Sequence, residues 1–179
     1  MSFADYRQKE KIRLHVELHL PDSFRNATSE RTSGLDKVII PLGDNLSVNA
    51  ELLASAVFTD VAIVKDAAGS VRERVDAVLI PRMISSQRVA PITGYVRQPW
   101  RIAVILEWVL KDPGSNLIWV DTITAEGKVS ELSSSGEENR KNLIETLIQD
   151  LFRKSYEAIS SSPEIRNFAA ERTTKNNKD

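Results

Sequence analysis

The sequence contains no cysteine among its 179 residues. The fold therefore has no disulfide, no thiolate nucleophile and no cysteine-ligated metal. A chain without cysteine suits an oxidising compartment, where a free thiol is a liability, although cytosolic chains can also lack it. No apolar run approaches the ~20 residues that a membrane-spanning helix requires. Residues 1–11 are polar and form no hydrophobic signal region.

The chain also lacks an excess of charge of either sign. Its 24 basic and 25 acidic residues leave a formal net charge of −1. The basic residues are scattered, so no overall field would attract nucleic acid or an anionic membrane. The apolar share of 41% and the charged share of 27% are ordinary for a soluble globular protein. The length fits one domain with a real core.

Histidine is scarce, and both histidines, His15 and His19, lie on one predicted strand with Glu17 between them. Strand alternation puts these three side chains on one face, with neighbours about 6.6–6.8 Å apart along the chain. Imidazoles and carboxylates are zinc ligand types. Ligands on one flat strand diverge, however, and we interpret the three as the solvated face of a half-buried strand. We therefore expect no metal.

The patterns of catalytic and cofactor sites are missing as well. The SSSG stretch at 133–136 lacks the glycine–serine–glycine spacing of a nucleophile elbow. GDN at 43–45 precedes a predicted helix, whose N-terminus favours anions, but no phosphate-loop pattern is present. Asp76 and Asp121 stand near strands without a visible partner. We expect no catalytic residues and no cofactor, and we predict that the chain is not an enzyme.

Hydrophobic periodicity and turn residues predict the secondary structure. The order β, β, α, β, β, β, β, α, with the last four strands mostly antiparallel, indicates an α+β two-layer sandwich: one mixed sheet with two main helices on one face. Residues 22–34 are expected to form a loop, and 85–98 either extend a strand or form a loop. Asn45 or Ser47 is expected to cap the first helix. The predicted strands are 12–20, 38–40, 61–64, 76–84, 100–111 and 117–125. The first predicted helix carries Leu46 to Phe58 and ends near residues 59–60, and the later helices are 137–159 and 164–170.

The hairpin between residues 100 and 125 is the clearest pattern. DPGS at 112–115 supplies a turn, in which proline fixes one φ and glycine tolerates a positive φ at the next position. A turn centred on Pro113 and Gly114 places Trp108 directly across from Trp119, a pair that favours this register.

Domain boundaries follow from composition. Residues 1–11 are expected to be a flexible N-terminal segment, and 12–170 a single α+β domain. Residues 171–179 are expected to be a disordered tail. Pro81 argues that the strand at 76–84 is an edge strand or is bulged.

The segment 82–101 is the one local charge asymmetry, because its four arginines have no acidic residue among them. Arginines near aromatic side chains suit a protein contact or, less well here, a nucleic acid. The plain alternative is an exposed loop. We interpret the segment as a surface that contacts a partner protein, and its candidate residues are Arg82, Arg88, Tyr95, Arg97, Trp100 and Arg101.

A family likeness rests on a pattern of elements between residues 12 and 168. Its stretches are LHLP at 18–21, VIIPLG at 38–43, VFTDV at 57–61, DAVLIP at 76–81, LIWV at 117–120, LF at 151–152 and SPEI at 162–165. This pattern resembles that of small bacterial envelope lipoproteins with a TolB-amino-terminal-like α/β domain. The group includes uncharacterised lipoproteins and auxiliary factors of transport or surface-assembly systems.

The resemblance implies a periplasmic domain at the inner face of the outer membrane, tied there by an acylated N-terminal cysteine. Because this chain has no cysteine, it would be the mature domain without its signal and anchor. The resemblance supplies no catalytic residues. It implies a non-enzymatic domain that contacts envelope proteins or further copies of itself, through its open sheet face and its strand edges.

Two alternatives stay open. The first is a small-molecule or lipid-binding module, with its ligand held between the long helix and the sheet. The second, less favoured, is a cytosolic enzyme that would use His15 or His19 as a base.

Overall fold

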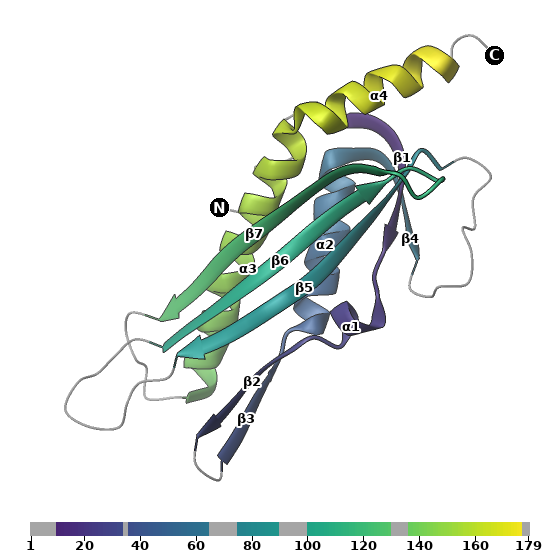
Figure 1. Cartoon of the computed structure of the whole chain (residues 1–179). Coiled ribbons are helices and arrows are strands. Elements are labelled where there is room, and N and C mark those ends of the chain that lie inside the picture. Colours follow the sequence, from purple (N-terminus) through teal and green to yellow (C-terminus); the bar gives the residue numbers. More distant parts are fainter. Residues whose placement is uncertain (1–9, 34–35, 65–74, 90–99, 130–135, 177–179) are drawn as a thin grey trace.

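The structure, a computed structural model, describes residues 10–33, 36–64, 75–89, 100–129 and 136–176. It has two layers, a five-stranded sheet and the helices α2 and α3 on one of its faces (Figure 1). A separate hairpin, β2–β3, projects beside the end of β5. The elements are β1 (Ile12–His19), α1 (Asp22–Arg25), β2 (Thr28–Ser33), β3 (Asp36–Pro41), α2 (Gly43–Val57), β4 (Phe58–Val64), β5 (Ala77–Val89), β6 (Trp100–Lys111), β7 (Leu117–Val129), α3 (Gly136–Ser161) and α4 (Pro163–Asn176).

The strand order in the main sheet is β4–β1–β5–β6–β7. β1 runs parallel to both of its neighbours, whereas β5, β6 and β7 form an antiparallel meander. Parallel neighbours need a crossover connection, and the connection from β1 to β4 runs through α2. The sheet is thus mixed and the α+β sandwich is confirmed, but β4 pairs with β1 and not with the later strands.

The expectation of a loop at residues 22–34 is wrong, because this segment holds α1 and β2. β2 pairs with β3 in a two-stranded sheet of its own. Its sequence TSERTS has no apolar alternation, so the strand depends on its partner β3, whose Ile40 is fully buried. Ser86 of β5 donates a hydrogen bond to the Thr28 carbonyl (3.4 Å), which ties the hairpin to the main sheet.

The core lies between the sheet and the helices. Trp108 of β6 is fully buried and its ring meets the Phe152 ring of α3 edge-on, with 6.4 Å between centroids. Such edge-to-face pairs add to the hydrophobic stabilisation that burial provides. The leucines that the sequence places on one stripe of α3 are all fully buried: Leu143, Leu147 and Leu151.

Two glycines permit close approach of backbone segments. A Cβ at Gly127 of β7 would lie 2.3 Å from the Leu143 carbonyl oxygen of α3. A Cβ at Gly43 would lie 1.8 Å from the Arg25 carbonyl oxygen. These glycines therefore let α3 pack directly onto β7 and let the start of α2 pack onto the end of α1.

The β6–β7 register differs from the predicted one. Trp119 pairs with Leu110, and Trp108 pairs with Asp121. The loop is longer than a two-residue turn, because Ser115 adopts a φ of 68° and the Asp112 amide bonds to the Asn116 carbonyl. A shift between Leu110 and Lys111 adds a further residue. Both tryptophans still face the core.

The start of α2 differs from the expectation that Asn45 or Ser47 caps it. The N-cap is Leu42, which makes no side-chain cap. Instead the amides of Leu42 and Gly43 both donate to the Ala27 carbonyl, each at 2.9 Å. A backbone oxygen from the α1–β2 connection thus binds the first two amides at this helix end.

The C-terminal helix starts as expected and continues further. Ser162 caps α4, with its Oγ accepting the Ile165 amide at 3.2 Å. The helix runs to Asn176, so the prediction of a disordered tail is wrong for residues 171–176. The Arg172 guanidinium, 5.0 Å from the centre of the Phe168 ring, packs one turn onto the next.

β5 is an interior strand, although Pro81 suggested an edge or a bulge. Only Ala77 to Leu79 pair with β1, so Pro81 lies beyond that pairing, and a register shift follows between Met83 and Ser85. The strand continues to Val89, which supports extension of the strand into the segment 85–98.

Candidate functional site: the open face of the sheet

We call the face of the main sheet that turns away from α2 and α3 the open face; it is toward the viewer in Figure 1. In β6, for example, the half-buried Glu107 alternates with Leu106 and Trp108, which are fully buried against the helices. Cross-strand pairing extends this alternation over the sheet. From β4 to β7 the open face carries Asp60, Ala62, His15, Glu17, His19, Val78, Ile80, Arg82, Arg101, Glu107, Val109, Lys111, Val120, Thr122, Glu126 and Lys128.

An apolar row crosses the open face over three strands. Ile80 of β5 pairs with Val109 of β6, which pairs with Val120 of β7. Val109 is only 5% exposed between its neighbours, whereas Val120 at the end of the row is 45% exposed. This row was not predicted from the sequence. The sequence does indicate the row, because the stretches DAVLIP and EWVL are apolar on both faces of their strands. A strand with one solvated face would instead alternate apolar and polar residues.

Arg82 lies beside this row and has an acidic neighbour. It pairs across the strands with Glu107, and Arg82 Nη1 lies 3.8 Å from Glu107 Oε1. Strand pairing therefore places the acidic Glu107 of β6 beside Arg82, where it offsets the positive charge of this arginine. Such exposed pairs contribute little to stability.

Arg101 lies further along β6 in a second group of charges. Arg101 Nη1 lies 3.6 Å from Glu126 Oε1, and Lys128 Nζ lies 3.0 Å from Glu126 Oε2. Arg82 and Arg101 therefore share the open face. Arg88 belongs to β5 and Trp100 begins β6, but their side chains, and the whole of Tyr95 and Arg97, lie outside the described residues.

His15 is held between two carboxylates, one on the neighbouring strand β4 and one directly before β5. Its Nδ1 lies 2.9 Å from Asp60 Oδ2 on β4, and its backbone amide donates to Asp76 Oδ2 at 2.9 Å. The Asp76 amide in turn donates to the His15 carbonyl. These bonds join β4, β1 and β5 at one level of the sheet, which explains Asp76 as a structural group.

Glu17 departs from the expected solvated strand face, because it is only 7% exposed. It pairs with Ala62 on one side and with Val78 on the other. Across the part of the chain that the structure describes, no three His, Asp or Glu side chains come together as metal ligands.

The other residues that the sequence suggested for catalysis or anion binding either have structural roles or lie outside the described residues. The Gly43 amide at the start of α2 is already bonded to the Ala27 carbonyl, so it does not offer an anion site. Asp121 Oδ1 accepts the Thr122 amide at 2.7 Å. The serines at 133–135 lie outside the described residues.

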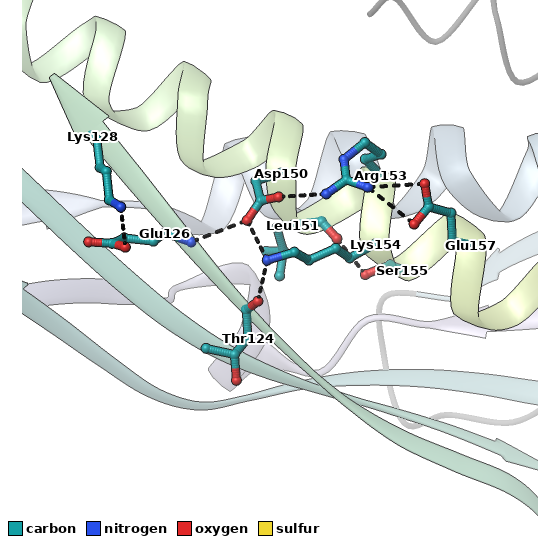
Figure 2. A network of polar contacts seen from close by, with 9 residues as sticks. All are labelled: Thr124, Glu126, Lys128, Asp150, Leu151, Arg153, Lys154, Ser155 and Glu157. Carbon is teal, nitrogen blue, oxygen red and sulfur yellow. Dashed lines mark hydrogen bonds and ion pairs between the residues drawn. The ribbon is translucent and has the colours of Figure 1, made fainter. Parts of the chain in front are cut away.

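Side chains of α3 bind part of the outer edge of β7 (Figure 2). Lys154 Nζ donates to the Thr124 carbonyl at 2.9 Å, and Asp150 Oδ2 accepts the Glu126 amide at 3.4 Å. Asp150 also accepts bonds from Lys154 (2.7 Å) and Arg153 (3.0 Å). Burial raises the pKa of Asp150, but these hydrogen bonds outweigh burial and leave the pKa below its usual value.

A cavity of about 670 Å³ lies where the first turns of α3 approach the start of α2. Its wall carries charges of both signs, including Glu137, Arg140 and Lys141, with Pro41 and Ile144 as apolar parts. It is separate from the open face. No helix in the described ranges is both long and apolar enough to cross a membrane.

No protein-family model matches the sequence, and no curated protein matches it. Solved structures resemble it at low identity. Protein XCC0632 from Xanthomonas campestris, of the family model DUF330, has a TM-score of 0.57 at 9% identity, over 94% of this chain and 92% of that chain. The hypothetical protein CT253 from Chlamydia trachomatis has a TM-score of 0.50 at 11% identity, over 84% and 96%.

A minor lipoprotein from Acinetobacter baumannii reaches a TM-score of 0.48 at 14% identity, over 84% of this chain and 93% of that chain. At these identities likeness concerns the fold alone. The chain is therefore similar in fold to XCC0632 and CT253, and the closer assignment to a TolB-amino-terminal-like domain stays a prediction.

Proposed function

We propose that this chain is a non-enzymatic domain of the bacterial cell envelope that binds another protein through its open face. The observation that carries the proposal is the apolar row Ile80–Val109–Val120, which α2 and α3 leave uncovered. Single exposed apolar side chains are ordinary, but a row across three strands is a candidate contact patch. Charged pairs on the same face, such as Arg82–Glu107, give the patch the polar surroundings of a protein interface.

The envelope location is supported by the resemblance of the sequence to small bacterial envelope lipoproteins. In this proposal the domain lies in the periplasm at the inner face of the outer membrane, as a component of a transport or surface-assembly system. A lipid anchor would come from a segment that is not in this sequence, because the sequence has no cysteine.

The alternative of a ligand held between the long helix and the sheet has little support. Leu147, Leu151 and Phe152 of α3 are fully buried and fill that space. The alternative of an enzyme based on histidine is no better supported. His15 has Asp60 beside it, but that pair sits on the exposed sheet surface, with the His15 side chain 55% exposed.

Site-specific photo-crosslinking tests the contact surface. A photoreactive side chain at Val120 should give one adduct with a different protein in intact cells, and Ile80→Asp in the same chain should abolish it. The control carries the same group at Gln149, an exposed residue of α3 that belongs to neither the open face nor the β4 edge. Equal adducts at both positions, no adduct at all, or an adduct with only a second copy of this chain would contradict the proposal.

A separate experiment tests the compartment. The complete natural gene product should incorporate radiolabelled palmitate and sediment with the membrane fraction. An unlabelled product in the cytosolic fraction would remove the envelope part of the proposal while leaving the contact surface to be judged by the crosslinks.

A further inference from the structure

The two edges of the main sheet differ, within the described residues, in how many of their outward backbone groups are hydrogen-bonded. On β7, every second residue turns its backbone outward, and one of the two outward groups has a hydrogen-bond partner at each of Thr122, Thr124, Glu126 and Lys128. Two are the Thr124 carbonyl and the Glu126 amide, bound by Lys154 and Asp150. The others are the Thr122 amide, bound by Asp121, and the Lys128 carbonyl, which accepts from Thr146 at 3.4 Å. Side chains of α3 therefore occupy part of this edge, which hinders pairing with another strand.

β4 forms the opposite edge of the sheet. The Val64 carbonyl accepts the Leu20 amide, so the backbone of Val64 faces β1. Alternation then turns the backbone groups of Val61 and Ile63 outward. Within the described ranges, no hydrogen bond to these outward groups occurs. The sequence of β4, FTDVAIV, also has no lysine or proline, the residues that commonly protect an edge strand.

Apolar side chains accompany this edge. Ile63 is 44% exposed, and Val61 beside it is half-buried on the same face of β4. α2 packs against β4 and exposes Val48 by 56% and Leu52 by 47%. A strand added to β4 would therefore gain backbone hydrogen bonds and apolar contacts together.

We infer that a second copy of this chain binds here, with the two β4 strands antiparallel about a two-fold axis at Ala62. Val61 then faces Ile63 of the second copy, and Asp60 faces Val64 of the second copy. The two sheets become one continuous sheet. A two-fold contact of this kind is self-complementary and closes at the dimer.

The charge pattern of β4 favours this register. Asp60 is the only charged residue of the strand, and like charges directly opposite each other destabilise a strand pair. With the axis at Ala62, the two Asp60 residues are offset by four positions along the strands. At about 3.4 Å for each residue, their carboxylates lie about 14 Å apart. That separation exceeds the screening length of about 8 Å at physiological salt. His15 also pairs with Asp60 within its own chain.

The inference goes beyond the proposed function, because it uses the edge of the sheet and leaves the open face free. Sedimentation equilibrium of the full chain should show a mass that rises with concentration from 20.0 kDa towards twice that value. Ile63→Lys should weaken the dimer about tenfold or more, because it puts a charge where the strands meet. The matched control is Leu117→Lys, at an exposed apolar residue (59%) of the other edge strand, β7, and it should leave the dimer intact.

The absence of cysteine allows a direct test of the register. Facing residues outside the hydrogen-bonded pairs lie about 4.5 Å apart at Cα, within the range of about 4.4–6.8 Å that a disulfide spans. Ala62→Cys should therefore form a covalent dimer on mild oxidation, whereas Thr122→Cys on β7 should not. A chain that stays monomeric at all concentrations would overturn the inference. So would dissociation by Leu117→Lys but not by Ile63→Lys, or crosslinking at position 122 and not at 62.

Discussion

The indole N–H of Trp108 donates a hydrogen bond to Ser155 Oγ, 2.9 Å away, in the interior between β6 and α3. Ser155 is fully buried and its Oγ donates in turn to the Leu151 carbonyl at 2.8 Å. This pair fixes how α3 sits on the sheet, because it is a directional contact within an otherwise apolar core.

Ser155→Ala should lower the free energy of unfolding by about 1–3 kcal/mol, because the Trp108 N–H is left buried without an acceptor. Urea unfolding followed by fluorescence and circular dichroism measures this. In a Trp108→Phe background the same substitution should cost clearly less. Equal costs in both backgrounds would mean that the hydrogen bond does not couple the two residues.

Gly127→Ala should also destabilise the fold, by about 1–3 kcal/mol through overpacking. The added Cβ would lie 2.3 Å from the Leu143 carbonyl oxygen, so α3 would have to move away from β7. Thr122→Ala, at an exposed position of the same strand, is the control for a change in strand composition. Comparable thermal unfolding midpoints for both variants would contradict the close approach.

How much of this fold the sequence predicts depends on the range of the interactions involved. The leucine stripe of α3 and the alternation of β6 are local patterns, and both elements form as predicted. β2 has no apolar pattern and exists through its pairing with β3. The predicted hairpin register is wrong because Ser115 adopts a left-handed conformation, which lengthens the loop. The sequence DPGS does not indicate that the serine would adopt this conformation.

The candidate site was less predictable, because it is created by neighbouring strands. Arg82 and Arg101 were found from their segment, but their acidic neighbours Glu107 and Glu126 lie on other strands. The apolar row Ile80–Val109–Val120 depends on the register between β5, β6 and β7, which the turn sequence alone does not specify. The same holds for Asp150, whose bond to the β7 edge depends on how α3 crosses the sheet.

Ser162→Ala should fray the start of α4 and cost about 1 kcal/mol, the usual worth of a serine N-cap. Ser162 Oγ accepts the Ile165 amide and donates to Glu164 Oε2 at 2.7 Å. The side-chain bond from Ser162 lowers the pKa of Glu164. Amide hydrogen exchange should show faster exchange in the first turn of α4 and unchanged protection in β6. Uniform loss of protection over the chain would indicate a global effect instead.

Acid should weaken the contact between α3 and the β7 edge through Asp150. Burial opposes its charge, but bonds from Lys154 and Arg153 prevail, so the folded-state pKa is lower than the unfolded one. A group of this kind stabilises the fold above its unfolded pKa, and the stabilisation is lost as the pH falls through the folded pKa. The advantage of the native chain over Asp150→Asn in the free energy of unfolding should therefore be full at neutral pH. It should shrink progressively below about pH 4, near the ordinary pKa of aspartate.

Lys154→Met provides the matched test of the cause. It removes both the bond to Asp150 and the bond to the Thr124 carbonyl, so Asp150 should lose its stabilising effect at a higher pH than in the native chain. Denaturant unfolding of the native chain, the two single variants and the double variant across the acid range gives the coupling at each pH. A coupling between Asp150 and Lys154 that stays constant from neutral to acid pH would show that the charge of Asp150 does not hold α3 against the edge of β7.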